Sequence, residues 1–277
     1  MQRFVFGALA LALCIAVPSA HAQLKKLDTK GWGSLSGQVK YDGDPLPPPV
    51  DLTGLMKKHN DKECCLDPKA KEIEKLDHKW LVDPKTRGVA NVMIWIKPPE
   101  GTFLPVHKNL EKLPDCVIDQ PHCAFLPHVA GFVPKRFDDT GKLVETGQKL
   151  ILRNSAKVPH NVRAIPHPII NARKEFNINI PPKTDIDTKT FNPQPIPVTL
   201  QCDFHPWMSA RLFVFDQPYF AVTDNEGRFE IPVLPAGTKI FVAAYHEDIG
   251  YIFGKQGQAF EVKEGKNVLD FTVKKAN

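Results

Sequence analysis

The stretch Cys202-Asp-Phe-His205-Pro-Trp-Met208 brings a thiol, an imidazole and a thioether together within seven residues. It follows a short alternating strand pattern, Val198–Leu200, and its spacing is C-x2-H-x2-M. Soft sulfur ligands favour cuprous copper, and imidazole accepts both oxidation states of the metal. A short loop also keeps its ligands in nearly fixed positions, so little moves when the oxidation state changes. The stretch therefore predicts a redox-active copper site that follows a strand.

A second imidazole is expected from a segment farther upstream. The alternating residues Lys149–Leu152 predict a strand, and Pro159 marks a turn that presents His160 and Asn161. A histidine placed at the end of a strand can meet a loop that lies far away in the sequence. We therefore take His160 as the candidate for the second nitrogen ligand.

The segment Thr146–Val162 resembles the stretch of plastocyanin and pseudoazurin that carries the first histidine ligand, and the loop Cys202–Met208 is similar to that of amicyanin. The resemblance covers roughly residues 115–216 and implies a cupredoxin, a Greek-key β-sandwich that holds a single type 1 copper ion. It also implies four metal ligands, the last of them a weak axial one: His160, Cys202, His205 and Met208.

The same resemblance gives roles to the neighbours of these ligands. Asn161 matches the asparagine that ties the two ligand loops together by hydrogen bonds, which would orient the thiolate. Trp207 would lie at the rim of the site, with Pro206 beside it. We expect His205, near this apolar rim, to be the point at which electrons leave. The alternative for Trp207 is simple packing over the loop.

Other kinds of metal site fit these residues less well. A structural zinc site usually draws on paired Cys or His ligands, whereas a Met stands at the fourth place here. Multicopper oxidases and copper nitrite reductases join two copper sites through a His beside the Cys, and here the neighbours are Gln201 and Asp203. We therefore expect a one-electron carrier and not an enzyme. The alternative is a copper-binding protein for transport or storage, which the low methionine count of 4 disfavours.

The N-terminus has the pattern of a secretory signal peptide. Arg3 precedes an apolar run, Phe4–Val17, and the small-residue motif Ala20-His-Ala22 follows. The run is shorter than the roughly 20 residues of a membrane-spanning helix. We therefore expect residues 1–22 to be removed after Ala22, and the mature chain to be periplasmic or secreted, without a membrane span.

The net charge of +5 is modest, and the basic residues are spread along the chain. A nucleic-acid-binding protein would gather its positive charge on one face, so we expect no nucleic-acid partner. A mild positive charge suits protein redox partners that are acidic. The oligomeric state is not indicated by the sequence.

Five cysteines remain once the signal peptide and its Cys14 are removed. An odd number in an oxidising compartment means that one sulfur does not pair, and the copper site gives that role to Cys202. The others can form two disulfides, and their connectivity stays open: Cys64, Cys65, Cys116 and Cys123. Because adjacent cysteines rarely bridge each other, we hypothesise that the first two bond to the last two.

The remaining histidines are interpreted as structural. His122 and His128 flank Cys123 and could belong to a second metal site, but nothing in the pattern sets the three side chains on one face. We favour a disulfide cysteine with two histidines at the surface or the edge of the core. Three further histidines show no partner in the sequence: His107, His167 and His246.

Short alternating segments separated by Gly, Pro, Asp and Asn run through the whole chain, and they predict an all-β fold of β-sandwiches. Residues 34–47 and Val89–Ile96 resemble the first strands of a carboxypeptidase regulatory-like domain, a transthyretin-like sandwich. Its remaining strands are similar to segments after the copper loop, beginning with Phe220–Ile231. A loop at Asp224–Gly227 predicts a hairpin there.

The economical domain organisation is an insertion. The cupredoxin at residues 99–216 interrupts the regulatory-like sandwich, whose two parts are residues 33–98 and 217–275; two sequential sandwiches are the alternative. Residues 51–83 fit neither pattern and form an excursion, in which residues 67–76 could be a short charged helix that begins at Asp67. The regulatory-like part could also serve adhesion or docking to the cell envelope.

Overall fold

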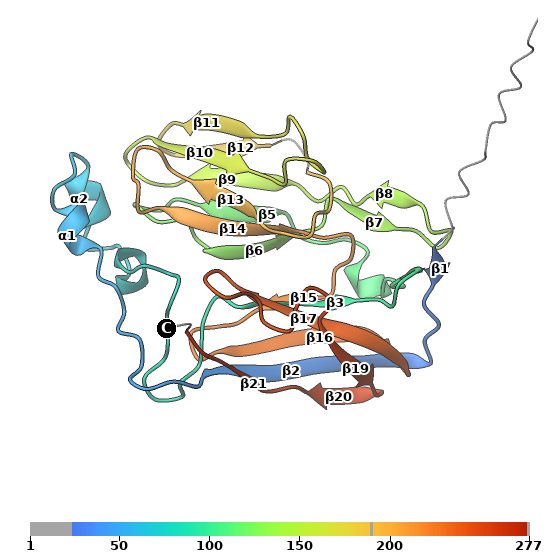
Figure 1. The fold of residues 1–277 in the computed structure, drawn as a ribbon. Coiled ribbons are helices and arrows are strands. Elements are labelled where there is room, and N and C mark those ends of the chain that lie inside the picture. The colour runs from blue at the N-terminus through green and yellow to red at the C-terminus, as the bar shows by residue number, and fades with distance from the viewer. Residues whose placement is uncertain (1–23, 189–190, 276–277) are drawn as a thin grey trace, which may run out of the picture.

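The computed structural model describes residues 24–188 and 191–275, so the signal peptide expected at residues 1–22 lies outside the described residues. Almost all regular structure in them is β-strand, which confirms the all-β prediction. Figure 1 shows two β-sandwiches, one above the other, with two short helices beside the upper one. No helix in the described ranges is long and apolar enough to cross a membrane.

The upper sandwich consists of a five-stranded sheet, order β11-β10-β13-β14-β6, and a three-stranded sheet, order β12-β9-β5. In β9 and β13 every second side chain is buried, so the alternating pattern of the sequence turns one face of each strand inward. Phe125, Phe132 and Phe191 fill the core. The strands are β5 (Cys116–Asp119), β6 (Val129–Phe132), β9 (Leu150–Asn154), β10 (His160–Ile165), β11 (Phe176–Ile180), β12 (Thr184–Asp187), β13 (Val198–Gln201) and β14 (Ser209–Val214).

The lower sandwich also has two sheets. One has the order β15-β3-β17-β18 with β19 paired to β17, and the other has the order β16-β2-β20 with β21 paired to β2. Its strands are β2 (Gly31–Tyr41), β3 (Met93–Lys97), β15 (Phe220–Val222), β16 (Arg228–Ala236), β17 (Thr238–His246), β18 (Gly250–Tyr251), β19 (Gln258–Val262), β20 (Gly265–Val268) and β21 (Phe271–Val273). Outside the two sandwiches lie the pair β1 (Lys25–Lys26) and β4 (Thr102–Phe103), the hairpin β7 (Lys135–Phe137) and β8 (Leu143–Glu145), and the 3-10 turn η2 (Lys108–Leu110).

The strands of the lower sandwich come from both ends of the chain. β2 and β3 precede the upper sandwich and β15 follows it, and β15 pairs antiparallel with β3, Phe220 opposite Trp95. The chain thus leaves and re-enters the lower sandwich on neighbouring strands, which is the geometry that tolerates an inserted domain. An apolar cluster that includes Trp95, Phe213 and Phe215 packs between the sandwiches. That the lower sandwich belongs to the regulatory-like family stays a prediction.

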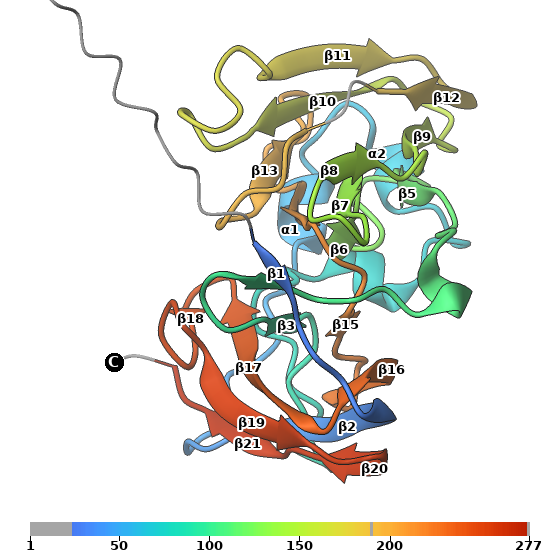
Figure 2. The ribbon, with the colours of Figure 1, turned by 90° about the vertical axis from the view of Figure 1, so that its right-hand side faces the viewer.

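Residues 51–76 form a cap at one end of the upper sandwich, and its two helices are labelled in Figures 1 and 2. The rest of the excursion returns to the lower sandwich, where Trp80 packs in the core. The cap contains α1 (Thr53–Met56), α2 (Lys62–Cys65) and the 3-10 turn η1 (Glu72–Lys75). The prediction of a helix over residues 67–76 is wrong, because the only helical part of this segment is the short 3-10 turn η1. Ile73 and Leu76 are too few apolar residues to give that segment a buried helical stripe.

One disulfide, Cys65–Cys123, fastens the cap to the upper sandwich. It joins residues 58 positions apart, and a loop of that length corresponds to about 4 kcal/mol of stabilisation through chain entropy. The second expected disulfide is absent from the described residues, because Cys64 and Cys116 are buried free thiols. Neighbours on a helical turn point about 100° apart, so only one of Cys64 and Cys65 can face Cys123.

Candidate metal centre

The end of the upper sandwich beside the cap brings the predicted ligands together. His160 is the first residue of β10, Cys202 directly follows β13, and Met208 directly precedes β14. β10 pairs antiparallel with β13, and β13 with β14, so all three strand ends meet at one edge. The loop between β13 and β14 is closed by two backbone hydrogen bonds, Met208 N to the His205 carbonyl and Cys202 N to the Met208 carbonyl.

His160, Cys202 and His205 form a compact buried group, with one ligand atom of each within 4.8 Å of the others. The Cys202 Sγ lies 3.8 Å from His160 Nδ1 and 3.7 Å from His205 Nδ1. A single ion that binds sulfur at about 2.3 Å and nitrogen at about 2.0 Å can bridge separations of up to about 4.3 Å. These three side chains therefore fit one metal ion. Met208 is also buried and ends the same loop, directly before β14.

Burial sets the protonation of this group. Loss of solvent, with a smaller contribution from the nearby His205, lowers the pKa of His160 to about 3. Loss of solvent and the adjacent His59 lower the pKa of His205 to about 4, against an opposing effect of Asp61. Both rings are therefore neutral near pH 7 and can donate a lone pair. Burial raises the pKa of the Cys202 thiol, so an ion that binds there must displace a proton.

Asn161 connects the two segments that carry these ligands. Its Oδ1 accepts a hydrogen bond from the Asp203 backbone N–H at 2.7 Å and lies 3.3 Å from the Cys202 Sγ. Its Nδ2 donates to Asn177 Oδ1 at 2.7 Å and to Asp203 Oδ2 at 3.1 Å. The side chain itself is buried. Asn161 thereby holds the start of the Cys202 loop against β10.

His205 lies near Trp207, but its own side chain has no exposed surface. The cap covers it: the His59 ring lies 4.5 Å from the His205 ring, and Asp61 Oδ2 lies 3.1 Å from His205 Nε2. His59 Nε2 is also 3.0 Å from the carbonyl of Phe204. Sequence reasoning missed His59 and Asp61 because they belong to the excursion that matched no family. Their position shortly before the cysteine pair was the only signal.

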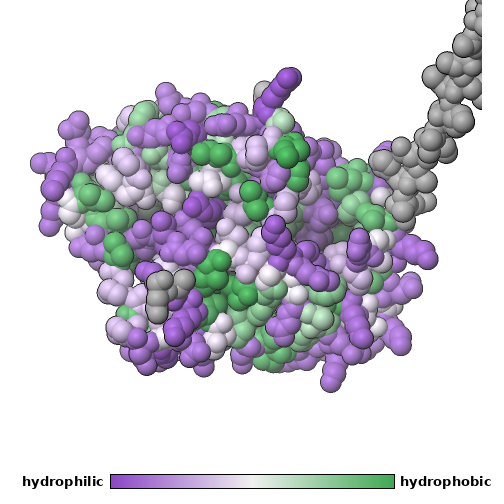
Figure 3. Space-filling model, in the orientation of Figure 1, coloured by the Kyte–Doolittle hydropathy of each residue, from purple (hydrophilic) through white to green (hydrophobic). Residues whose placement is uncertain are grey.

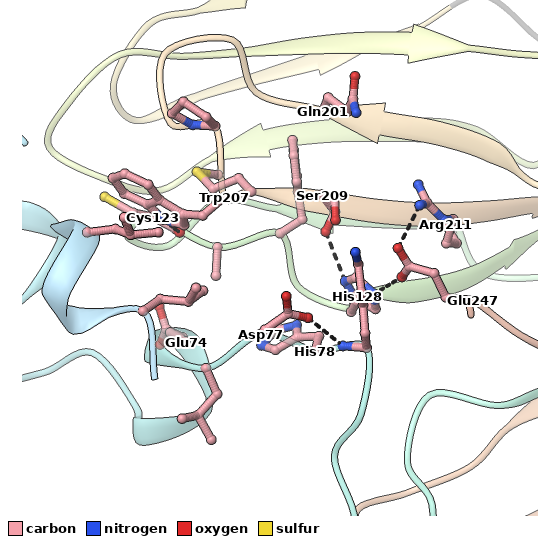
Figure 4. A pocket seen from close by; sticks show the side chains of 18 residues that line it. Glu74, Asp77, His78, Cys123, His128, Gln201, Trp207, Ser209, Arg211 and Glu247 are labelled. Atoms are coloured by element: carbon pink, nitrogen blue, oxygen red, sulfur yellow. Dashed lines mark hydrogen bonds and ion pairs between the residues drawn. The ribbon is translucent and has the colours of Figure 1, made fainter. Parts of the chain in front are cut away.

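Trp207 is half-buried and anchors the loop from the other side. Its Nε1 donates a hydrogen bond to the Cys123 carbonyl at 3.1 Å, and its ring lies 5.5 Å from that of His205. The disulfide partner Cys123 thus contacts both the cap and the metal loop. Figure 4 shows Trp207 and Cys123 at one end of a pocket of about 340 Å³.

Ionic contacts line the other end of this pocket and account for the two histidines that flank Cys123. His128 lies 2.7 Å from Glu247 and 2.9 Å from the Ser209 carbonyl, as the dashed lines in Figure 4 show. His122 pairs instead with Glu74 at 2.8 Å. Both histidines thus have a carboxylate partner, and their structural role stays a prediction.

The three histidines without a partner in the sequence have one in the structure. His107, His167 and His246 each accept a hydrogen bond from a nearby backbone N–H. The ring of His107 also lies 4.6 Å from that of Trp32, and the ring of His246 lies 4.2 Å from that of Trp80. These contacts support their structural role.

No protein-family model and no curated protein matches this chain. Solved structures give similarity over 36% of the chain. A copper-containing nitrite reductase from Thermus scotoductus SA-01 is 12% identical with a TM-score of 0.28, and the chain covers 22% of it. A purple cupredoxin from Nitrosopumilus maritimus is 15% identical with a TM-score of 0.26 and is covered completely. A reduced amicyanin mutant is 13% identical with a TM-score of 0.27, covered to 82%. The chain thus spans about a fifth of the reductase.

Proposed function

We propose that this chain binds one type 1 copper ion and carries single electrons between protein partners. The observation that carries the proposal is the buried group of one thiol and two neutral imidazoles, with a thioether in the same loop. His160, Cys202 and His205 would hold the ion, with Met208 as a fourth and weaker ligand. When bound, copper supplies the one-electron Cu(II)/Cu(I) couple.

The protein's contribution is a frame that keeps the ligands in place. The strand ends fix His160 and Cys202, and Asn161 links them through the backbone of Asp203. The cap packs on the outer side of His205, and Trp207 is tied to the disulfide loop. Ligands held on several sides cannot rearrange much between oxidation states, and this keeps the barrier to electron transfer low.

We also propose that the chain is not an enzyme. Cys202 and Met208 are 2% exposed and both ligand histidines have no exposed surface, so a substrate has no open path to the ion. The same burial argues against a transport or storage protein, because ligands enclosed on all sides release a metal slowly. Slow metal exchange together with fast electron exchange would separate the carrier from that alternative.

Partners are expected to dock beside the cap, outside the cytoplasm. There His59 and Trp207 are the partly exposed rings that separate His205 from solvent, and Leu55 and Phe204 are exposed apolar side chains nearby. Figure 3 shows hydrophobic residues scattered among hydrophilic ones on the face in view, without one continuous apolar patch. The net charge of +5 favours acidic proteins as partners.

The test is the visible absorption and EPR spectrum of the Cu(II)-loaded mature protein and of two loop variants. The wild type should show the intense band and narrow copper hyperfine splitting of a copper–thiolate bond. Cys202→Ser should abolish the band, whereas Met208→Leu should keep it and mainly shift the reduction potential. A colourless wild type, or a Cys202→Ser protein that keeps the band, would overturn the proposal.

A further inference from the structure

The cap brings a second group of metal-binding side chains next to the first. One ligand atom each of His59, Cys65 and His205 lie within 4.8 Å of one another. Cys65 and His205 are buried, and His59 is partly buried. Two of these residues come from the cap, so this group is separate from the copper ligands except for the shared His205.

The two nitrogens of His205 face different groups. Nδ1 lies 3.7 Å from the Cys202 Sγ, on the side of the proposed copper site. Nε2 faces the cap: it is buried, lies 3.1 Å from Asp61 Oδ2, and lacks a properly aligned hydrogen bond within the described part of the chain. The same Asp61 oxygen lies 3.7 Å from His59 Nδ1. A buried polar atom without a hydrogen bond is unfavourable, and a bound cation would satisfy it.

The third member of the group, Cys65, is held in the disulfide with Cys123. A sulfur in a disulfide is not a thiolate and is a poor ligand for a cation. The group is therefore blocked while the bridge is intact. The bridge lies between the cap and the metal loop, since the Cys123 carbonyl accepts the hydrogen bond of Trp207.

We propose that reduction of the Cys65–Cys123 disulfide opens a second metal site, formed by His59, Cys65 and the Nε2 of His205. A dithiol would supply two electrons and two protons: the S–S bond breaks, both cysteines become thiols, and the dithiol becomes a disulfide. A cation that binds displaces the Cys65 thiol proton. Where copper already occupies Nδ1, the Nε2 proton of His205 leaves as well, because a ring bound at both nitrogens carries no N–H.

The ligand types select the cation. Two imidazoles and one thiolate, with the Asp61 carboxylate close by, match the ligands that tetrahedral zinc takes in proteins. The group includes no thioether of the kind that favours cuprous copper. The proposed ligand is therefore a borderline-soft divalent cation of the zinc type. The site would make the metal content of the chain depend on the thiol redox state of its compartment, independently of electron transfer.

Two serine variants form a matched pair for the test. Cys123→Ser and Cys65→Ser break the same bridge, but only Cys123→Ser leaves Cys65 as a free thiol. Both are loaded with copper and then titrated with Zn(II) alone, and bound zinc is counted by elemental analysis after gel filtration. We expect copper-loaded Cys123→Ser to bind one zinc ion per chain. Copper-loaded Cys65→Ser and the oxidised wild type should bind none. Adding His59→Ala to Cys123→Ser should remove the extra zinc.

Equal zinc in the two variants would overturn the proposal. If neither variant folds, wild type reduced with dithiothreitol and freed of it by gel filtration replaces them; it should take up one zinc more than the oxidised protein, and no difference would overturn the inference. The copper band is recorded on the same samples. An absent band with an intact zinc difference would count against the electron-carrier proposal only, and a normal band without a zinc difference would count against the second site only.

Discussion

The substitution Asn161→Ala would remove the side chain that joins the two ligand segments. Three well-formed hydrogen bonds would be lost, to the Asp203 N–H at 2.7 Å, Asn177 Oδ1 at 2.7 Å and Asp203 Oδ2 at 3.1 Å. Each contributes about 1 kcal/mol to stability. Because Asn161 is only 1% exposed, water cannot readily replace it. We expect the metal-free protein to lose about 3 kcal/mol of unfolding free energy.

The control is Asn177→Ala, which removes a partner of the same network from an exposed position. Asn177 bonds to Asn161 and, at 2.7 Å, to Asp203 Oδ2, but solvent reaches it, so its loss should change stability by about 0.5 kcal/mol or less.

Urea denaturation of both metal-free variants, followed by tryptophan fluorescence, measures the difference. The loaded Asn161→Ala protein should also bind copper about 10- to 100-fold more weakly. A loss below about 1 kcal/mol, no larger than in Asn177→Ala, would refute the reasoning that this amide holds the site together.

Two further predictions concern buried ionisable side chains. The pKa of His160 is lowered to about 3 and that of His205 to about 4, mainly by burial, so below pH 6.5 the unfolded chain binds more protons than the folded one. The free energy of unfolding of the metal-free protein should fall by up to about 1.4 kcal/mol per pH unit for each histidine as the pH falls from 6.5 toward 4. Urea denaturation midpoints that do not change over this range would contradict the prediction. Glu247→Gln should lower the free energy of unfolding by about 3 kcal/mol, because it leaves Arg211 and His128 without their shared carboxylate. A melting temperature equal to that of the wild type would show that the contacts of Glu247 with Arg211 and His128 do not stabilise the fold.

The sequence by itself determined the parts of this protein that depend on local pattern. Alternating apolar residues marked strands such as β9 and β13, because a strand with one buried face needs a period of two. The loop Cys202–Met208 carries its own chemistry in seven consecutive residues, so it could be read without a fold. The turn at Pro159 marked His160 as a candidate, and the resemblance of its segment to a known one gave it the role of a ligand.

Tertiary structure decided what covers the site. His59 and Asp61 reach His205 from about 145 residues away in the sequence, and no local pattern encodes a contact over that distance. Of the two expected disulfides only Cys65–Cys123 is found among the described residues. The sequence could not indicate which cysteine of the pair would bond, because the turn of α2 decides which of them faces Cys123. Local residue types set which side chains can bind a metal. Which of them lie together, and which are buried, depends on how the sheets and the cap pack, and packing is a property of the whole chain.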